Sequence, residues 1–297
     1  MNNNDFGLLL QALRKNSIDK KGNRWTRDSL SETIHLTRSQ LGRLERGDRK
    51  YLDSQILQLL ADAFKLTNFE KREFLQAAAG ISDDQLYGHE QPENQLDQLL
   101  SIMNKLQVPA FILDVYADLV AVNSSVLVLY QVTPDLISYA NKIPAAMNFV
   151  YFVYSEEFGL KSLLGSQWRE VADMAMLFFR RSTLRYRHTP YFSYLFKALL
   201  KEEQFDIDWY TSQRLDNHYD LTYEQLNYMH PHYGSLNYVA TETAINSSNG
   251  ELFLIIYNPT NKETVQVFSD LHREYGNSIL RLASWPTKKR YKQNLHL

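Results

Sequence analysis

The sequence of 297 residues contains no cysteine. This absence excludes disulfide bonds, zinc–thiolate sites, iron–sulfur clusters and cysteine nucleophiles. Glycine is sparse as well, and none of the glycine-rich patterns that cradle phosphates or form a nucleophile elbow occurs. The sequence therefore gives no support for the common nucleotide-dependent and serine-nucleophile enzymes, and we expect a protein that is not an enzyme.

Long hydrophobic runs are also missing. Residues 108–132 are interrupted by Asp114 and Asp118, and residues 143–154 are too few for a membrane-spanning helix, which needs ~20 apolar residues. The N-terminal residues show neither the basic start nor the apolar core of a signal peptide. We expect a soluble, cytoplasmic protein with no membrane partner.

Candidate metal ligands are few. His230 and His232 are separated by one proline and could lie close together, but the spacing supplies no third ligand. We interpret this pair as the end of a loop. We therefore expect no metal site, no catalytic residues and no cofactor.

The hydrophobic pattern changes along the chain and predicts two domains. In residues 1–80 apolar residues recur at helical spacing, which predicts five short helices and no strand. Residues 81–95 are polar, contain glycine and proline, and are interpreted as a linker. Residues 96–285 form the second predicted domain, and residues 286–297 form a basic tail.

The second domain mixes helices and strands. A helix over residues 96–106 is followed by two short strands, AFILD and LVAVN, and then by a long helical stretch. Three alternating segments lie within residues 223–258, and Asn249-Gly250 between the last two is a strong hairpin signal. Residues 264–282 predict a terminal amphipathic helix. The fold class is therefore predicted to be α+β, with an antiparallel sheet in the second domain.

The net charge of −2 hides an uneven distribution along the chain. Residues 1–80 hold 14 lysines and arginines against 10 acidic residues, a net charge of +4. Residues 81–287 carry −10, and residues 288–297 carry +4. Because local potential drives attraction to phosphate, the basic first domain favours nucleic acid as a partner although the total does not.

Residues 26–47, TRDSLSETIHLTRSQLGRLERG, predict two short helices joined by a tight turn at His35 and Leu36. Thr26 and Thr37 stand where an N-cap hydroxyl accepts a backbone N–H. The leucines and isoleucine fall on inward faces, so the outward face of the second helix is polar. That face suits base edges in the DNA major groove, and the flanking cations suit phosphates. The candidate DNA-binding residues are Thr26, Arg27, Thr37, Arg38, Ser39, Gln40, Arg43, Arg46, Arg49 and Lys50.

This segment resembles the helix-turn-helix of the XRE (phage-repressor-like) family, from its threonine start to its L-E-R-G end. The resemblance implies a lambda-repressor-like, five-helix DNA-binding domain. The sequence departs from the pattern at Ser31, where the family has a small alanine, and at His35, where it has glycine. The alternative interpretation is a plain helical bundle with an exposed arginine face.

The second domain resembles the MmyB-like ligand-binding domain, which follows an XRE helix-turn-helix in a group of bacterial regulators. The resemblance covers most of residues 96–270. It implies a PAS-like fold with a pocket for a hydrophobic small molecule, and a long-chain fatty acid is the expected ligand. The residues that carry it are Pro109, Ala110, Leu113, Asp114, Val120, Ala121, Asn123, Trp168, Ala172, Phe179, Arg180, Phe205, Trp209 and the late strands through Tyr257.

Aromatic residues and methionines are abundant where a pocket is expected, and such side chains suit an adaptable apolar wall. Two arginines nearby could bind a carboxylate head group. The candidate ligand-binding residues are Phe149, Phe152, Met174, Phe178, Phe179, Arg180, Arg181 and Tyr191. Taken singly, such aromatics belong to the core more often than to a pocket, and such arginines are more often at the surface or ion-paired, here with Glu170 or Asp173.

Together these features predict a homodimeric transcription regulator. The first domain binds a double-stranded DNA operator, and the second senses a hydrophobic small molecule and dimerises. Two half-sites read by two short helices multiply specificity. Two alternatives stay open, namely a hydrolase or transferase with a DNA-binding head, and a repressor whose second domain only dimerises or binds a protein. The tail KKRYK either touches DNA phosphates or is a disordered end.

Overall fold

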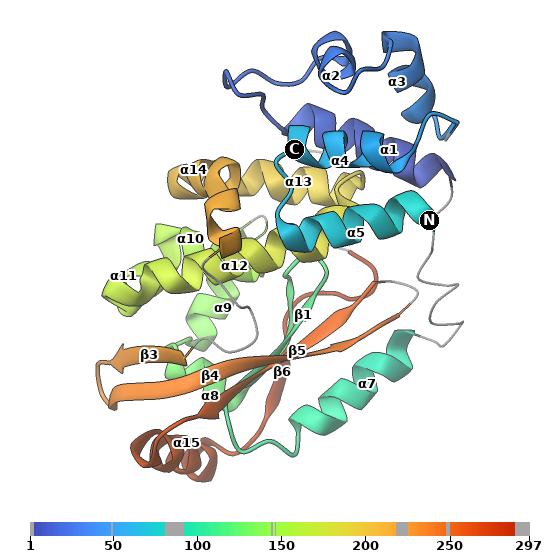
Figure 1. Cartoon of the computed structure of the whole chain (residues 1–297). Coiled ribbons are helices and arrows are strands. Elements are labelled where there is room, and N and C mark those ends of the chain that lie inside the picture. The colour runs from blue at the N-terminus through green and yellow to red at the C-terminus, as the bar shows by residue number, and fades with distance from the viewer. Residues whose placement is uncertain are drawn as a thin grey trace.

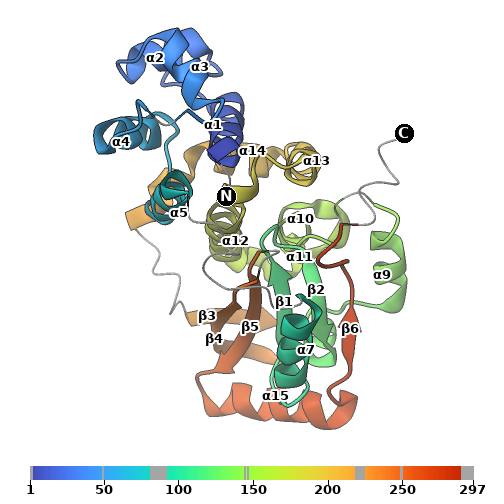
Figure 2. The ribbon, with the colours of Figure 1, turned by 90° about the vertical axis from the view of Figure 1, so that its right-hand side faces the viewer.

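The computed structural model describes residues 3–48, 50–80, 92–143, 145, 147–217, 225–247 and 250–288. Figure 1 shows a group of helices from the N-terminal part of the chain above an α+β part, and Figure 2 shows the same two parts from the side. We call residues 3–80 the head and residues 92–288 the body. The body contains the sheet, and the head lies over one end of it.

The head consists, in its described residues, of helices whose apolar faces meet in one core. These are α1 (Asn3–Asn16), α2 (Arg27–Thr33), α3 (Arg38–Leu44), α4 (Ser54–Ala63) and α5 (Asn68–Ala79). Leu30, Leu41 and Phe74 are fully buried in this core. Side-chain oxygens of threonine or aspartate cap the N-termini of α2 to α5, so each helix begins where the sequence supplies a cap.

The body contains an antiparallel sheet with strand order β3-β4-β5-β1-β2-β6. Its strands are β1 (Ala110–Asp114), β2 (Leu119–Asn123), β3 (Gln225–His230), β4 (Gly234–Ile245), β5 (Leu252–Pro259) and β6 (Ile279–Arg281). The expected α+β class and antiparallel sheet are confirmed.

Helices cover both faces of this sheet. Alternate residues of a strand point to opposite faces. Ala110 and Ile112 pack against α7 (Pro92–Met103), whereas Phe111 and Leu113 belong to the larger core on the other face. That larger core is built with α8 (Ser124–Leu129), α9 (Pro134–Ala140), α10 (Phe149–Tyr154), α11 (Leu160–Leu164), α12 (Trp168–Thr183), α13 (Pro190–Leu199), α14 (Glu203–Thr211) and α15 (Lys262–Tyr275).

The end of the body differs from the sequence prediction. The helix expected over residues 264–282 ends at Tyr275, because Gly276 turns the backbone to a positive φ of 69°. Residues 279–281 then form β6, which pairs with β2. Three residues are too few to show a strand pattern in the sequence. The helix expected over residues 96–106 is α7, which begins earlier, at Pro92. Residues 81–91 of the expected linker and Asn249 of the hairpin signal lie outside the described residues.

Head and body are packed together. Leu184, in the 3₁₀ turn Leu184–Tyr186 after α12, is fully buried within the core of the head. Both views place α5 on α12 (Figures 1 and 2). The described helices include none that is long and apolar enough to cross a membrane.

Candidate functional site

The body encloses an apolar cavity of about 190 Å³ between the sheet and its helices. The strands contribute Phe111, Val122 and Ile255, and α12 contributes Met174 and Phe178. An apolar core cavity of about 150 Å³ stays dry and takes up benzene-sized molecules. This cavity is therefore suited to an apolar ligand.

The spacing of residues on α12 explains which of them reach the cavity. Val171, Met174, Ala175 and Phe178 recur at three- and four-residue steps and line it from one helix face. Phe179 follows about 100° further around the helix. It packs instead in a fully buried cluster with the rings of Phe192, Phe205 and Trp209.

The structure brings five of the eight predicted ligand-binding residues to the cavity. These are Phe149, Phe152, Met174, Phe178 and Arg181. The other three lie elsewhere. Phe179 is in the helix core, Arg180 points to the head, and the hydroxyl of Tyr191 donates to Oδ2 of Asp118 at 2.5 Å.

Among the described residues that line the cavity, Arg181 is the one cation and Glu242 of β4 is the one anion. Nη2 of Arg181 donates to both carboxylate oxygens of Glu242 at 2.8 Å. The guanidinium also lies over the rings of Phe178 and Phe253, at 5.5 and 5.7 Å. The cavity thus has apolar walls with one ion pair set into them.

The same ion pair lines a second, polar cavity of about 170 Å³ between head and body. The head contributes Arg72, Glu73 and Gln76 of α5 to this polar cavity. Arg181 and Glu242 therefore stand between the apolar cavity on one side and a helix of the head on the other.

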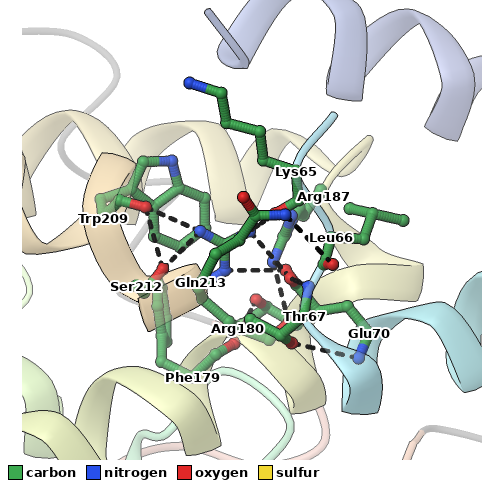
Figure 3. A network of polar contacts seen from close by, with 11 residues as sticks. Lys65, Leu66, Thr67, Glu70, Phe179, Arg180, Arg187, Trp209, Ser212 and Gln213 are labelled. Atoms are coloured by element: carbon green, nitrogen blue, oxygen red, sulfur yellow. Dashed lines mark hydrogen bonds and ion pairs between the residues drawn. The ribbon is translucent and has the colours of Figure 1, made fainter. Parts of the chain in front are cut away.

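A buried ionic cluster joins α5 to α12 (Figure 3). Arg180 donates from Nε and Nη2 to the two carboxylate oxygens of Glu70, at 3.0 and 2.8 Å. Arg187 donates to the same carboxylate and to the carbonyl oxygen of Arg180. Nη1 of Arg180 reaches the carbonyl oxygen of Trp209 at 2.7 Å and the Ser212 hydroxyl at 2.6 Å. We call Glu70, Arg180 and Arg187 the junction cluster.

One carboxylate is shared by two guanidinium groups in the junction cluster. Burial by itself would raise the pKa of Glu70, but the guanidinium groups of Arg180 and Arg187 outweigh it and hold that pKa below its usual value. Burial lowers the pKa of Arg187 to about 10, although the carboxylate of Glu70 opposes this. Because both guanidinium groups share the carboxylate and also donate to carbonyl oxygens or to the Ser212 hydroxyl, the three groups can be buried together at the domain boundary.

Consecutive arginines of α12 therefore serve opposite sides of the molecule. Arg180 reaches the head and Arg181 reaches the cavity. Neighbouring residues on a helix point about 100° apart, so one helical turn can touch both places. The last turn of α12 therefore contacts both the cavity and the head, through Arg181 and Arg180 respectively.

The C-terminal segment folds back on the body. The ammonium group of Lys288 contacts Asp114 and lies 2.6 Å from Oδ2 of Asp118, with the rings of Tyr116 and Tyr191 around it. Burial, opposed by Lys288, raises the pKa of Asp114 to about 6. The first lysine of the basic tail is thus held by the body, and residues 289–297 lie outside the described residues.

In the head, α2 and α3 meet at a tight turn. Thr26 and Thr37 each cap a helix and form a capping box with Ser29 and Gln40, which confirms both predicted N-caps. His35 adopts a φ of +57°, a conformation that favours glycine. This explains why glycine would suit this position in the resembling family.

Several predicted DNA-binding residues are exposed on this surface, namely Thr26, Thr37, Arg38, Ser39, Arg43, Arg46 and Lys50. Arg43 donates to the Tyr51 hydroxyl at 3.3 Å, and Arg38 lies 3.4 Å from Asp28. The side chains of Arg27 and Gln40 already bind other groups of the head. Arg27 pairs with the buried carboxylate of Glu45 at 2.6 Å, and Oε1 of Gln40 accepts from the Thr37 backbone at 2.7 Å. Arg49 lies outside the described residues.

Sequence reasoning missed the residues that join the two parts. No local pattern in the sequence distinguishes Glu70 or Arg187 from the residues around it. Their separation of 117 residues leaves no local spacing to detect. His230, considered above as a metal ligand, instead accepts the backbone N–H groups of His232 and Tyr233 at Nδ1. The described residues contain no group of three side chains placed to hold a metal ion.

An apolar cavity with one ion pair in its wall, joined to a basic helical head, defines a protein with a small-molecule-binding domain. The comparison with known families agrees with this class. The MmyB-like transcription regulator ligand binding domain matches residues 94–271, more than half of the chain, and the chain belongs to this family. No curated protein sequence matches the chain.

Proposed function

We propose that this protein is a DNA-binding transcription regulator whose body binds a hydrophobic small molecule with an acidic head group, a long-chain fatty acid. The observation that carries this proposal is the apolar cavity with Arg181 as its one cation among the described lining residues. Apolar walls favour an alkyl chain. A guanidinium group provides paired donors for a carboxylate. Membership of the ligand-binding family supports the same interpretation.

The head supports DNA as the partner. We interpret α2 and α3 as a helix-turn-helix of the XRE type, because both helices begin at a threonine cap and enclose a tight turn. Arg43 and Ser39 are exposed on α3 and suit base edges, whereas Arg46 and Lys50 suit phosphates. The net charge of +4 in residues 1–80 favours the approach to DNA.

We also propose that the protein acts as a homodimer. Helix α3 has seven residues and can read only a few bases. Two copies on two half-sites would multiply the specificity. Sedimentation of the purified chain tests this, since a monomer at the concentration that saturates DNA would contradict a dimer.

The ligand is tested by extraction. Protein purified without added lipid is extracted with organic solvent, and the compounds in the extract are identified by mass spectrometry. We expect an amphiphile with a long alkyl chain. Absence of any lipid, together with no thermal shift on adding fatty acids, would contradict a hydrophobic ligand. It would favour the second candidate, a regulator whose body only dimerises or binds a protein.

The DNA contact is tested with duplexes selected from a random library. Arg43→Ala is expected to weaken the selected sequence by about 1–3 kcal/mol and to relax base preference. Lys50→Ala is the matched control, and it should weaken all sequences alike and lower the salt slope by about one. Equal losses on selected and random duplexes for Arg43→Ala would rule out its role in base reading.

A further inference from the structure

The two cavities share a wall, and this wall consists of the ion pair between Arg181 and Glu242. In the structure both carboxylate oxygens of Glu242 accept from Nη2 of Arg181, a donor that an acidic ligand would also use. The Arg181 side chain is 18% exposed and the Glu242 side chain 30%. The glutamate is therefore the more accessible partner, and it is the one that can move away.

An incoming carboxylate cannot share this site with Glu242 at low cost. Two anions on one guanidinium repel each other, and the repulsion is strong between apolar walls because the local dielectric is low. Arg181 is held by the rings of Phe178 and Phe253. A ligand acid that reaches Arg181 would therefore displace Glu242 and leave the arginine in place.

A displaced Glu242 would already face the head. The polar cavity that it lines also contains Arg72 of α5. Arg72 has an exposed pair with Glu73 at 3.3 Å, and its side chain is 72% exposed. Exposed pairs of this kind contribute little, so Arg72 is available to a second carboxylate.

We propose that Glu242 is an internal stand-in for the ligand's carboxylate, and that an acidic ligand transfers Glu242 from Arg181 to Arg72 of the head. This inference rests on the proposed function and adds its regulation. No bond is made or broken, and only ion pairs change partners. The new ion pair between β4 and α5 changes the contact between body and head, and so changes the affinity of the head for DNA.

The exchange distinguishes ligands of equal chain length. Dodecanoic acid and dodecanol both place an alkyl chain in the cavity, but only the acid carries the charge that replaces Glu242. The probes are these two compounds, and binding is followed by displacement of a neutral solvatochromic dye. DNA affinity of the full chain is measured by fluorescence anisotropy on a duplex selected from a random library.

With the unaltered chain, we expect both compounds to displace the dye. The acid should change the DNA dissociation constant about fivefold or more, the lower end of usual allosteric coupling, and the alcohol should change it less than twofold. In Glu242→Gln the acid and the alcohol should have the same small effect. Glu251→Gln is the matched control, because Glu251 lines the polar cavity only, and it should behave as the unaltered chain.

Arg72→Gln gives a second test on an exposed side chain. It should bind the acid as the unaltered chain does and lose the effect on DNA. Equal effects of acid and alcohol on the unaltered chain would overturn the exchange. So would an unchanged response in both Glu242→Gln and Arg72→Gln, although the proposed function would then stand. If neither compound displaces the dye, the ligand class and the exchange both fail.

Discussion

Two glutamates are buried in the part of the chain that the structure describes, and each lies between two arginines. Glu45 lies in the head, with Arg14 and Arg27 both at 2.6 Å. Glu70 also belongs to the head, but its partners Arg180 and Arg187 come from the body. The two sites share a composition and differ in what they connect.

The arginines of the two sites differ in their exposure to solvent. The side chains of Arg14 and Arg27 are 11% and 41% exposed, whereas those of Arg180 and Arg187 are 6% and 3% exposed. Arg27 can therefore be solvated when it loses its carboxylate, but the arginines of the junction cluster cannot. The Glu45 site stabilises one part of the molecule, and the junction cluster holds two parts together.

The largest effect is expected when the junction cluster loses its anion. Glu70→Ala leaves two guanidinium groups buried without a counter-ion, and breaking such a buried site costs about 3–5 kcal/mol. We expect the free energy of unfolding in urea to fall by this amount and the head to detach from the body. Glu73→Ala, one turn along α5, removes a pair whose arginine is 72% exposed and can be solvated, and it should cost less than about 1 kcal/mol. Equal losses in the two variants would contradict the account.

The pH dependence of the free energy of unfolding tests whether Glu70 acts as an ion-pair partner. The pKa of Glu70 is lowered in the folded protein from a usual value of 4.5. Its contribution is therefore fully present above pH 4.5 and is lost as the pH falls through the lower folded value. Urea unfolding of the unaltered chain and of Glu70→Gln should differ most near pH 7 and converge in acid. A difference that grows in acid would contradict the ion pairing.

A smaller loss is expected at Glu45. Glu45→Ala removes the partner of Arg14 and Arg27, but the partial exposure of Arg27 limits the loss to about 2–3 kcal/mol. Hydrogen exchange should show faster opening of α1 to α3, with protection unchanged in the strands of the body. Loss of protection throughout the body would show that the two glutamates act alike.

A substitution at Gly7 tests how closely α1 packs against the backbone of Glu45. A Cβ at Gly7 would lie 2.6 Å from the carbonyl oxygen of Glu45, so α1 approaches this turn as closely as a glycine allows. Gly7→Ala should lower the free energy of unfolding by about 1–3 kcal/mol. At Gly42 of α3 a Cβ meets its nearest neighbour at 3.5 Å, and Gly42→Ala should raise that free energy by about 0.5–1 kcal/mol. The same sign in both variants would contradict the close packing.

The smallest effect is expected at the turn between α2 and α3. His35 holds a φ of +57°, which costs a non-glycine residue about 1–2 kcal/mol. His35→Gly relieves this strain and loses part of the gain to backbone entropy, so we expect a net stabilisation of about 0.5–1 kcal/mol. Thermal unfolding measures it, and a lower melting temperature would show that the turn relaxes without glycine.

The sequence predicted those features that depend on local spacing. The caps at Thr26 and Thr37, the strands at residues 110–114 and 119–123, and the long helical stretch that contains α12 each follow a short pattern, and the structure has them. The sequence predicts Arg180 and Arg181 together as ligand-binding residues, because composition alone cannot separate neighbours on a helix. Only the packing of α5 on α12 assigns one to the cavity and the other to the junction cluster.

Features that depend on distant segments were not predictable in this way. Glu70 meets Arg180 across 110 residues, and Lys288 meets Asp118 across 170. Strand β6 exists because the edge of β2 is available to it, and its three residues carry no pattern of their own. In each case the contact depends on which surfaces meet after folding, and the local sequence does not indicate this.

The central claim is that ligand binding in the cavity and the proposed DNA binding by the head are energetically coupled. The most direct measurement is the affinity for dodecanoic acid with and without a saturating operator duplex. Coupling is reciprocal, so the operator must change the acid's dissociation constant by the same factor, about fivefold or more, by which the acid changes the operator's. Identical affinities for the acid with and without the operator would contradict the account.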